Sequence, residues 1–234
     1  MRNYLMINGV DSRTYGVYIS GQGAFSAPSR AYDIIPIPGR NGALIGAEKR
    51  FENIEVKYPA FIYNNFKTNI ADFRAFLLSQ EGYFTLSDSY NANEYRMAMY
   101  AGPFDPDVSS KNDAGKFDIV FNCKPQRFLT SGSTKTTLTA NGTITNPTKF
   151  DAKPLLRVYG TGSVGIGSQT ITITAASTYT DIDCEMQDCY KGSVSKNECV
   201  SFSGNDFPVI TAGTNSITLT TVTKVEITPR WWTV

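Results

Sequence analysis

Carboxylates at alternate positions are the first candidates for chemistry in this sequence. Asp181, Asp183 and Glu185 lie on one predicted strand, where alternate residues share a face. Two carboxylates on one face can flank a glycosidic bond and act as acid and nucleophile. A solvated strand face explains the same pattern, and we favour it. A hydrolase that works through Asp181 and Asp183 is therefore the weakest of three functional hypotheses.

Histidine is absent from the 234 residues of the chain. It is the side chain most often used as a general base and as a metal ligand, and Ser-His-Asp and Cys-His nucleophiles require it. Its absence lowers the expectation of catalysis, and we expect no enzyme activity.

One loop resembles a calcium site but lacks two necessary parts. Asp105, Asp107 and Ser109 match the opening of a calcium-binding loop. Ser110 stands where glycine is needed, and Lys116 stands where a bidentate glutamate is needed. We expect a solvated loop without a metal.

A glycine pattern from Gly160 to Gly165 matches the fingerprint of dinucleotide-binding proteins. That fingerprint works only when a helix begins directly after it, because the helix N-terminus holds the pyrophosphate. The sequence that follows has a strand pattern, so we expect a glycine-rich hairpin and no cofactor.

The four cysteines, Cys123, Cys184, Cys189 and Cys199, lack the Cys-x-x-Cys spacing of a zinc site. Cys123 and Cys184 fall on apolar faces of predicted strands, where a free thiol packs as a small hydrophobic group. We expect free buried thiols and keep a disulfide between Cys189 and Cys199 as the alternative. Metal binding by cysteine is the least favoured outcome.

Charge and composition exclude further classes of function. Lysine and arginine total 22 and aspartate and glutamate total 21, so a dedicated nucleic-acid binder is not expected. Hydrophobic residues make up 41%, enough for a packed core. The N-terminus lacks the apolar segment of a signal peptide, and no run approaches the roughly 20 apolar residues of a membrane helix. We expect a soluble chain made in the cytosol, without membrane insertion.

A long hairpin precedes the only predicted helix. Between Ile54 and Ile62 apolar and polar residues alternate, which predicts a strand buried on one side. Pro36, Pro38 and Pro59 cannot donate to a ladder, so they indicate strands at an edge or beyond the sheet. The residues from Gly39 to Gly42 provide the turn between the two arms. Because such a hairpin buries little surface alone, it needs its own core or another subunit.

An apolar stripe with spacings of four, three and four predicts an amphipathic helix over about 66–80. The stripe consists of Phe66, Ile70, Phe73 and Leu77. Thr68 or Asn69 can cap the start of this helix, and Gly82 stands where a helix commonly ends.

The composition changes near Thr130, and we expect a domain boundary there, between 1–130 and 131–234. Beyond it, short strands at close intervals predict an antiparallel sandwich, and Asn141-Gly142 predicts a tight hairpin. The fold class is therefore mainly β. Trp231 and Trp232 face opposite ways on a predicted last strand. One should lie in a core and the other at an inter-domain or inter-subunit contact.

Five motifs, taken in their order and spacing, resemble the distal tail protein family of siphophages, the long-tailed, non-contractile bacteriophages. The motifs are Ile7 to Ser12 with Tyr15-Gly16, the turn Pro38 to Gly42, the segment Phe73 to Phe84, the strand end Phe121 to Pro125, and Ile227 to Trp232. The resemblance spans essentially the whole chain, although no single motif is specific.

The resemblance implies an N-terminal β-sandwich with one α-helix and a projecting β-hairpin, called a belt, at about 34–58. A C-terminal galectin-like antiparallel β-sandwich follows. In this family the belt embraces the adjacent subunit and closes a hexameric ring. The implied subunit interface consists of Ile35, Ile37, Pro38, Gly39, Arg40, Asn41, Gly42, Leu44 and Ile45. It remains open whether the last strand, at about 226–234, returns to the N-terminal domain.

The family also implies partners and a location. The ring joins the tail tube protein to tip or baseplate proteins, which include a tail-associated lysin or a receptor-binding protein. Its place is the tail tip of the virion, after assembly in the host cytoplasm. The favoured function is therefore a structural hub.

A carbohydrate-binding module for attachment to the host cell surface is the second hypothesis, because galectin-like sandwiches often bind sugars. A sugar site usually needs an exposed aromatic platform with polar groups converging on it. The candidates are Tyr159, Tyr179, Tyr190, Phe202 and Phe207, and nothing in the sequence clusters them.

Overall fold

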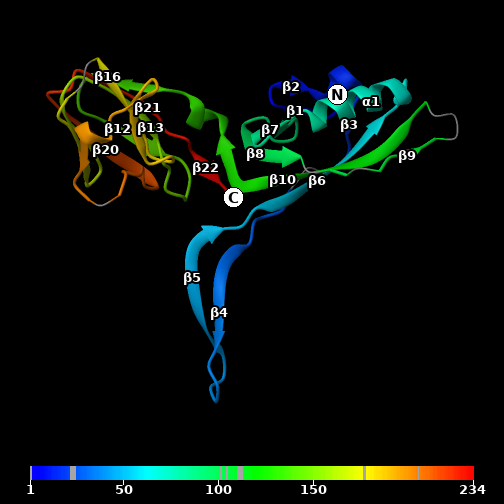
Figure 1. Cartoon of the computed structure of the whole chain (residues 1–234), viewed down its shortest axis with the longest axis horizontal. Coiled ribbons are helices and arrows are strands. Elements are labelled where there is room, and N and C mark those ends of the chain that lie inside the picture. Colours follow the sequence, from blue (N-terminus) through cyan, green and yellow to red (C-terminus); the bar gives the residue numbers. More distant parts are fainter. Residues whose placement is uncertain are drawn as a thin grey trace. The chain divides into compact units, whose positions relative to one another are not determined.

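The computed structural model describes residues 2–21, 25–100, 102–103, 105–109, 113–175, 178–204 and 206–234. The chain divides into two compact units, the first reaching to Arg127 and including Val234, the second spanning Phe128–Thr233. Both are built mainly of antiparallel strands, as the sequence predicts. Figure 1 shows the course of the chain through each unit.

The first unit contains a twisted sheet with the strand order β2-β1-β7-β8-β10-β6-β3. Its strands are β1 (Leu5–Ile7), β2 (Val10–Asp11), β3 (Tyr18–Ile19), β6 (Ile54–Ile62), β7 (Phe84–Asp88), β8 (Glu94–Tyr100) and β10 (Gly115–Leu129). The short β9 (Asp107–Val108) also pairs with β10. A further partner of β10 is β22 (Trp232–Thr233); the last residues of β10, Phe128 and Leu129, belong to the second unit.

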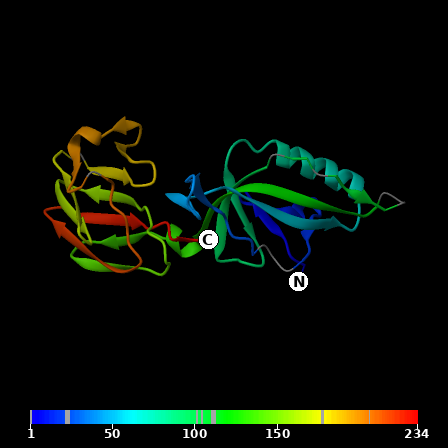
Figure 2. The same ribbon diagram turned by 90° about the horizontal axis from the view of Figure 1, so that it is seen from below.

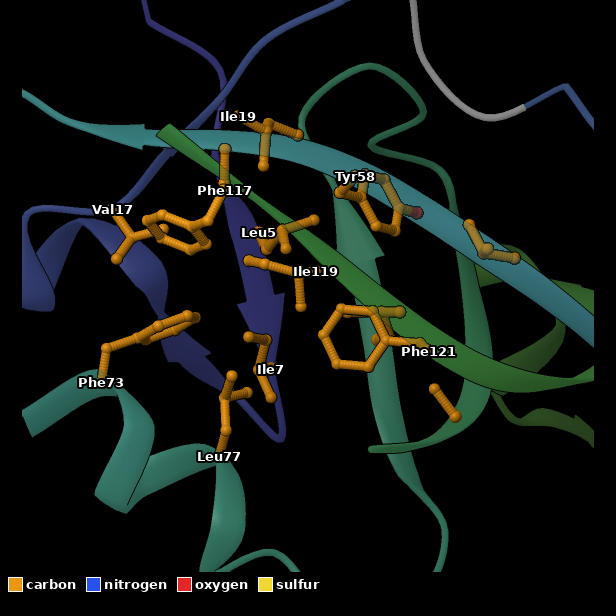
Figure 3. Close-up of a cluster of buried hydrophobic side chains, with 14 of the residues drawn as sticks. Leu5, Ile7, Val17, Ile19, Tyr58, Phe73, Leu77, Phe117, Ile119 and Phe121 are labelled. Carbon is orange, nitrogen blue, oxygen red and sulfur yellow. The ribbon is translucent and has the colours of Figure 1, made fainter. Parts of the chain in front are cut away.

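The ladder between β6 and β10 carries much of the first core. Tyr58 pairs with Ile119 and Val56 pairs with Phe121, and all four side chains are buried. Alternate residues of both strands therefore face the same interior, as the period of two in the sequence predicts. Figure 3 shows the side chains of Tyr58, Ile119 and Phe121 in one cluster with Leu5 and other core residues.

The helix α1 (Phe66–Leu78) lies along one face of these strands (Figure 2) and is the only α-helix in the described residues. Phe66, Phe73 and Leu77 of the predicted stripe are buried, and Ile70 packs against the same core. The burial of one stripe, rather than of the whole surface, is what its amphipathic pattern requires.

The helix begins before both predicted capping residues, Thr68 and Asn69. Asn65 is the N-cap and makes no side-chain cap hydrogen bond. The backbone N–H of Phe66 instead donates to the carbonyl of Asp113 at 3.2 Å. A tertiary contact thus satisfies one of the first N–H groups of the helix, which have no partner within the helix.

The second unit is a sandwich of two antiparallel sheets, with the orders β11-β21-β13-β16-β17-β18 and β12-β20-β14-β15-β19. Its strands are β11 (Thr136–Leu138), β12 (Gly142–Asn146), β13 (Leu155–Tyr159), β14 (Gly162–Ile166), β15 (Gln169–Ile173), β16 (Tyr179–Asp183), β17 (Asp188–Lys191), β18 (Val194–Ser195), β19 (Val200–Phe202), β20 (Gly213–Thr220) and β21 (Lys224–Thr228). Leu156 and Ile227 from one sheet share a buried core with Val164 and Ile171 from the other.

The predicted hairpin at Asn141-Gly142 is wrong. Strand β11 pairs with β21 in one sheet and β12 pairs with β20 in the other, so this turn crosses between sheets. The side chain of Asn141 accepts a hydrogen bond from the backbone N–H of Leu219 at 2.8 Å, which ties the turn to β20. A turn sequence fixes the local bend but not the partner of the strand that follows.

Candidate functional site

The hairpin of β4 (Arg30–Pro36) and β5 (Ala43–Phe51) forms a sheet of its own. Within the described residues these strands pair only with each other, and Figure 1 shows them standing away from the sheet of the first unit. At the tip, Gly39 and Gly42 take positive φ angles of 77° and 86°. Glycine reaches this conformation without the steric cost other residues pay, so the predicted turn residues are the ones that close the hairpin.

Both faces of the hairpin carry exposed aliphatic side chains. Ile34 lies opposite Ile45, and their exposed fractions are 69% and 63%. One residue further along, Ile35 lies opposite Leu44, and theirs are 51% and 57%. Because successive residues of a strand point to opposite faces, one aliphatic pair lies on each side of the ribbon. The pairs cover each other only in part, which leaves most of their apolar surface in water.

All nine residues of the implied interface lie in this exposed hairpin. They are Ile35, Ile37, Pro38, Gly39, Arg40, Asn41, Gly42, Leu44 and Ile45. Ile34 and Tyr32, which the sequence reading left out of that set, are exposed as well. The apolar run of Ile34 and Ile35 could have found Ile34, because both residues lie on the same predicted arm of the hairpin.

The hairpin is shorter than the expected belt of about 34–58. Val56 and Tyr58 lie in β6 and are buried in the first core, and only Glu52 and Asn53 separate β5 from β6. The exposed ribbon therefore ends at Phe51. Arg30 lies over the Phe51 ring at 4.6 Å and pairs with it across the base.

Pro59 lies on β6, between β10 and β3, yet it interrupts no pairing with β10. Its carbonyl accepts from the backbone N–H of Ser20 at 2.8 Å, so the backbone polar groups of Pro59 face the β3 side. Strand β3 ends at Ile19, and the missing N–H of proline is therefore not needed by a ladder.

The carboxylates Asp181 and Asp183 are buried and paired, so the expectation of a solvated face was wrong. Arg157 binds Asp181 through two hydrogen bonds of 2.7 and 2.9 Å, and Arg230 binds Asp183 through two of 2.6 and 2.8 Å. Arginines from neighbouring segments cover the carboxylates, which is why they leave solvent. Glu185 stays exposed.

The electrostatics of Asp183 favour its ionised form. Burial raises the pKa of this carboxyl, but the Arg230 guanidinium and the backbone N–H groups of Met186 and Glu185 outweigh burial and lower it. A carboxylate held in this way has its lone pairs occupied by structural partners. It is not placed to protonate or attack a substrate.

The aromatic candidates form two pairs in the second unit. The Tyr159 and Tyr179 rings lie 6.0 Å apart, and the Phe202 and Phe207 rings lie 4.3 Å apart. Sequence reasoning missed this pairing because the partners come from different segments. The guanidinium of Arg157 sits over the Tyr179 ring at 4.2 Å, where a sugar would have to stack. Tyr190 lies opposite Asp181 on β17.

The two tryptophans make different contacts. Trp231 is buried in the core of the second unit, whereas the Trp232 ring stacks on Phe150 with centroids 4.4 Å apart. The indole N–H of Trp232 donates to the carbonyl of Asp151 at 2.9 Å. Whether either tryptophan also meets another subunit stays a prediction.

The ends of the second unit are joined by what we call the clasp. The Leu129 N–H donates to the Trp231 carbonyl, and the Arg230 N–H donates to the Gly132 carbonyl, each at 2.8 Å. A β-carbon added to Gly132 would collide with the backbone nitrogen of Trp231. The close approach of these two segments therefore requires glycine at position 132.

The remaining candidate motifs have structural roles. Gly162 begins β14, whose pairing with β15 confirms the expected glycine-rich hairpin. Asp107 pairs with Lys116 at the β9–β10 contact, while Ser110 lies outside the described residues. Among the described residues, no group of three or more acidic, histidine or cysteine side chains could hold a metal.

The cysteines are free thiols, as the favoured interpretation predicts. Cys123, Cys184 and Cys189 are buried, and Cys199 is half-buried. No α-helix in the described part of the chain has the length and hydropathy needed to cross a membrane.

Comparisons with known proteins identify one fold. No family model matches the chain, and no curated protein matches its sequence. Among solved structures, the chain is similar to SPP1 Dit (gp 19.1), described as a paradigm of the hub adsorption apparatus in phages that infect Gram-positive bacteria. The TM-score is 0.76 at 14% sequence identity, and the similarity covers 100% of both chains. The two proteins therefore share their fold over the full length.

Proposed function

We propose that this chain is a structural hub of a siphophage tail, and that each subunit lends its β4–β5 hairpin to a neighbouring copy to close a ring of six. The fold shared with a phage hub protein supports the general role. The observation that carries the assembly step is the ribbon itself, which exposes aliphatic pairs on both faces.

Burial of the hairpin supplies the driving force for this assembly. Fully burying an isoleucine or leucine side chain is worth about 1.5–3 kcal/mol relative to leaving it exposed. The four aliphatic side chains are already partly covered, so their further burial contributes roughly 4–8 kcal/mol per hairpin before ordering costs. Because both faces are apolar, the neighbour has to cover the ribbon on both sides.

The geometry of exchange explains a ring rather than a pair. Each subunit places its hairpin on one neighbour, and a different surface of the same subunit binds the hairpin of the other neighbour. Such a contact between two different surfaces is heterologous. Such contacts close into a ring when the rotation between subunits allows it. Each contact is modest alone, so isolated subunits stay monomeric when dilute and assemble as concentration rises.

The ring occupies the distal end of the tail in this proposal, where it joins the tail tube protein to tip or baseplate proteins. These include a lysin or a receptor-binding protein. The subunits assemble in the host cytoplasm and end in the virion. The proposal includes no catalytic step. It also includes no sugar site, because the Arg157 guanidinium lies over the Tyr179 ring.

A hairpin truncation tests the proposal. Tyr32 and Ala47 are paired in the ladder, so residues 33–46 can be replaced by Asn-Gly, which forms a two-residue hairpin turn. We expect the truncated chain to melt as the parent does but to remain monomeric. Light scattering across concentration should show a six-fold mass for the parent alone. A six-fold mass for the truncated chain overturns the proposal.

Paired substitutions separate apolar contact from mere hairpin length. The double variant Ile34→Ser with Ile45→Ser removes the aliphatic pair on one face. The double variant Ile35→Ser with Leu44→Ser removes the pair on the other face. Each double variant is expected to raise the concentration needed for assembly by at least tenfold. Serine at the exposed Met186 of the second unit is the matched control and should assemble as the parent does.

A further inference from the structure

Three Asn-Gly pairs occur in the chain: Asn8-Gly9, Asn41-Gly42 and Asn141-Gly142. In such a pair the backbone nitrogen of glycine can attack the side-chain amide of asparagine, because glycine has no β-carbon to hinder a close approach. The attack expels ammonia and leaves a five-membered succinimide ring. The three pairs therefore share one latent reaction, and the fold decides which of them can carry it out.

The first pair is held by tertiary hydrogen bonds. The Asn8 side-chain amide donates to Oε1 of Gln80 at 3.0 Å, and the Asn8 backbone N–H donates to the carbonyl of Thr85 at 2.8 Å. Asn8 and Gly9 have positive φ angles of 49° and 78° and join β1 to β2. This is a tight two-residue turn, whose backbone is fixed by the paired strands on either side.

The third pair is held as well. The Asn141 side chain accepts from the backbone N–H of Leu219 at 2.8 Å, and Gly142 belongs to β12, where it lies opposite Ile217. A β-carbon built on Gly142 would lie 3.2 Å from the Leu138 side chain, so the space beside this glycine is occupied. The side chain and the backbone of this pair are both restrained.

The second pair, at the tip of the β4–β5 hairpin, has no such restraint. Asn41 and Gly42 are exposed, and neither makes a hydrogen bond in the described part of the chain. The turn before them is closed by the Arg40 N–H, which donates to the carbonyl of Ile37 at 3.2 Å, and β5 begins only at Ala43. Beyond its chain neighbours, no atom lies within 4 Å of the position a β-carbon on Gly42 would take. The glycine nitrogen and the amide carbon are therefore free to approach each other.

We propose that Asn41-Gly42 is a site of self-modification, at which the unassembled chain converts Asn41 to aspartate and isoaspartate. Base removes the proton of the Gly42 backbone N–H, and the nitrogen bonds to Cγ of Asn41 once the two atoms come within about 3–3.5 Å. The C–N bond of the side-chain amide breaks, and its nitrogen leaves as ammonia. Water then opens the succinimide at either carbonyl, which gives aspartate or, when the backbone passes through the former side chain, isoaspartate.

The modification changes the tip that the proposed assembly has to bury. Arg40 is the only charged side chain from residue 34 to residue 46, so a carboxylate beside it takes the charge of the tip from +1 to zero. Burying an additional charged group is costly, and isoaspartate also lengthens the backbone. This consequence rests on the proposed exchange of hairpins. A ring that covers the tip protects Asn41, whereas a subunit modified before assembly assembles poorly.

Peptide mass spectrometry tests the modification on the unaltered chain. Trypsin places the three pairs on separate peptides, 3–13, 41–49 and 136–149. The dilute chain is held at mildly alkaline pH, and samples taken over days are examined for the mass increase that replacing NH2 by OH gives. Because local restraint slows ring closure, we expect peptide 41–49 to change at least about tenfold faster than the other two. Equal rates at the three pairs of the folded chain overturn the proposal.

Unfolding and two substitutions are the matched controls. In urea the restraints on Asn8 and Asn141 disappear, so all three peptides should change at similar rates. A lead of Asn41 that is as large in urea as in the folded chain overturns the proposal, because the neighbouring sequence would then set the rate. Gln80→Ala removes the partner of the Asn8 side chain and should speed the reaction at that pair alone. Asn41→Gln should abolish the change in peptide 41–49, and glutamine fits because Asn41 takes no positive φ.

Assembly measurements test the consequence separately. Asn41→Asp carries the charge of the product, and it should need at least about tenfold more protein than the parent to reach the six-fold mass, whereas Asn41→Gln should assemble as the parent does. Equal assembly of the two variants overturns the effect on assembly and leaves the modification standing. If the parent gives no six-fold mass at any concentration, the hairpin proposal fails, while peptide 41–49 of the dilute chain still decides the modification.

Discussion

Arg230 donates hydrogen bonds of 2.6 and 2.8 Å from its two terminal nitrogens to the carboxylate of Asp183, which lies 47 residues earlier in the sequence. The side chain of Asp183 is only 3% exposed. The same carboxylate accepts from the backbone N–H of Glu185 at 3.0 Å, so one residue ties a turn to the last segment of the second unit. Pairs of this kind decide how the second unit responds to mutation and to acid.

Removal of the charge at Asp183 is expected to destabilise the chain strongly. Asp183→Asn leaves Arg230 partly buried without its counter-charge, which should lower the free energy of unfolding by about 3 kcal/mol. Urea denaturation measures the change. Glu185→Gln is the control, because Glu185 is exposed and should change stability by less than about 0.5 kcal/mol. Equal effects of the two substitutions would contradict the role assigned to the pair.

Acid should weaken the second unit within a defined range of pH. The Lys224 ammonium, with help from Tyr159 and Lys135, lowers the pKa of Glu226 from 4.5 to about 2 despite partial desolvation. The pKa of Asp183 is also lowered. A carboxyl whose folded pKa is depressed stabilises the fold above its unfolded pKa, and that stability is lost as pH falls through the folded value. The free energy of unfolding should therefore drop between about pH 4.5 and 2, and the drop should shrink in Asp183→Asn.

Gly132 should tolerate no side chain. Gly132→Ala places a β-carbon against the backbone of Trp231, which cannot rotate away, and should cost about 2–3 kcal/mol. Gly204→Ala is the matched control, since no atom lies within 4 Å of the position its β-carbon would take. Thermal denaturation should separate the two by several degrees. An unchanged melting temperature for Gly132→Ala would show that the clasp is looser than described.

Thiol labelling should find one reactive cysteine in the folded chain. Burial raises the pKa of Cys123 to about 11, and burial with neighbouring acidic groups raises that of Cys184 and Cys189 to about 12. Few thiolates form at neutral pH in such sites, so a disulfide reagent should modify only Cys199 quickly. In urea all four should react. Two unreactive cysteines in urea would reveal the Cys189–Cys199 disulfide instead.

Periodic residues predicted the elements that bury a face. The alternation in β6 and the stripe of α1 appear in the structure because one side of each element packs on a shared core. Gly39 and Gly42 predicted the hairpin tip for a comparable reason, since a positive φ restricts the residue type. Such requirements concern residues that are close together in the sequence, so the sequence alone predicts these elements.

Long-range partners could not be predicted in the same way. Nothing next to Asp181 indicates Arg157, which lies 24 residues earlier, so the carboxylate looked solvated. The end of the hairpin was also hidden, because β5 runs almost directly into β6 and both have strand-forming sequences. Arg96 gave no sign of burial, because a charged residue in an alternating strand normally faces water.

The clasp has a consequence for how such a protein can change over generations. Its hydrogen bonds hold the first and last segments of the second unit side by side, so the chain enters and leaves this unit at one place. Recombination can replace, enlarge or lose a module with adjoining ends without shifting the strands that precede it. Variation in size among descendants is therefore expected to accumulate between the two halves of the clasp.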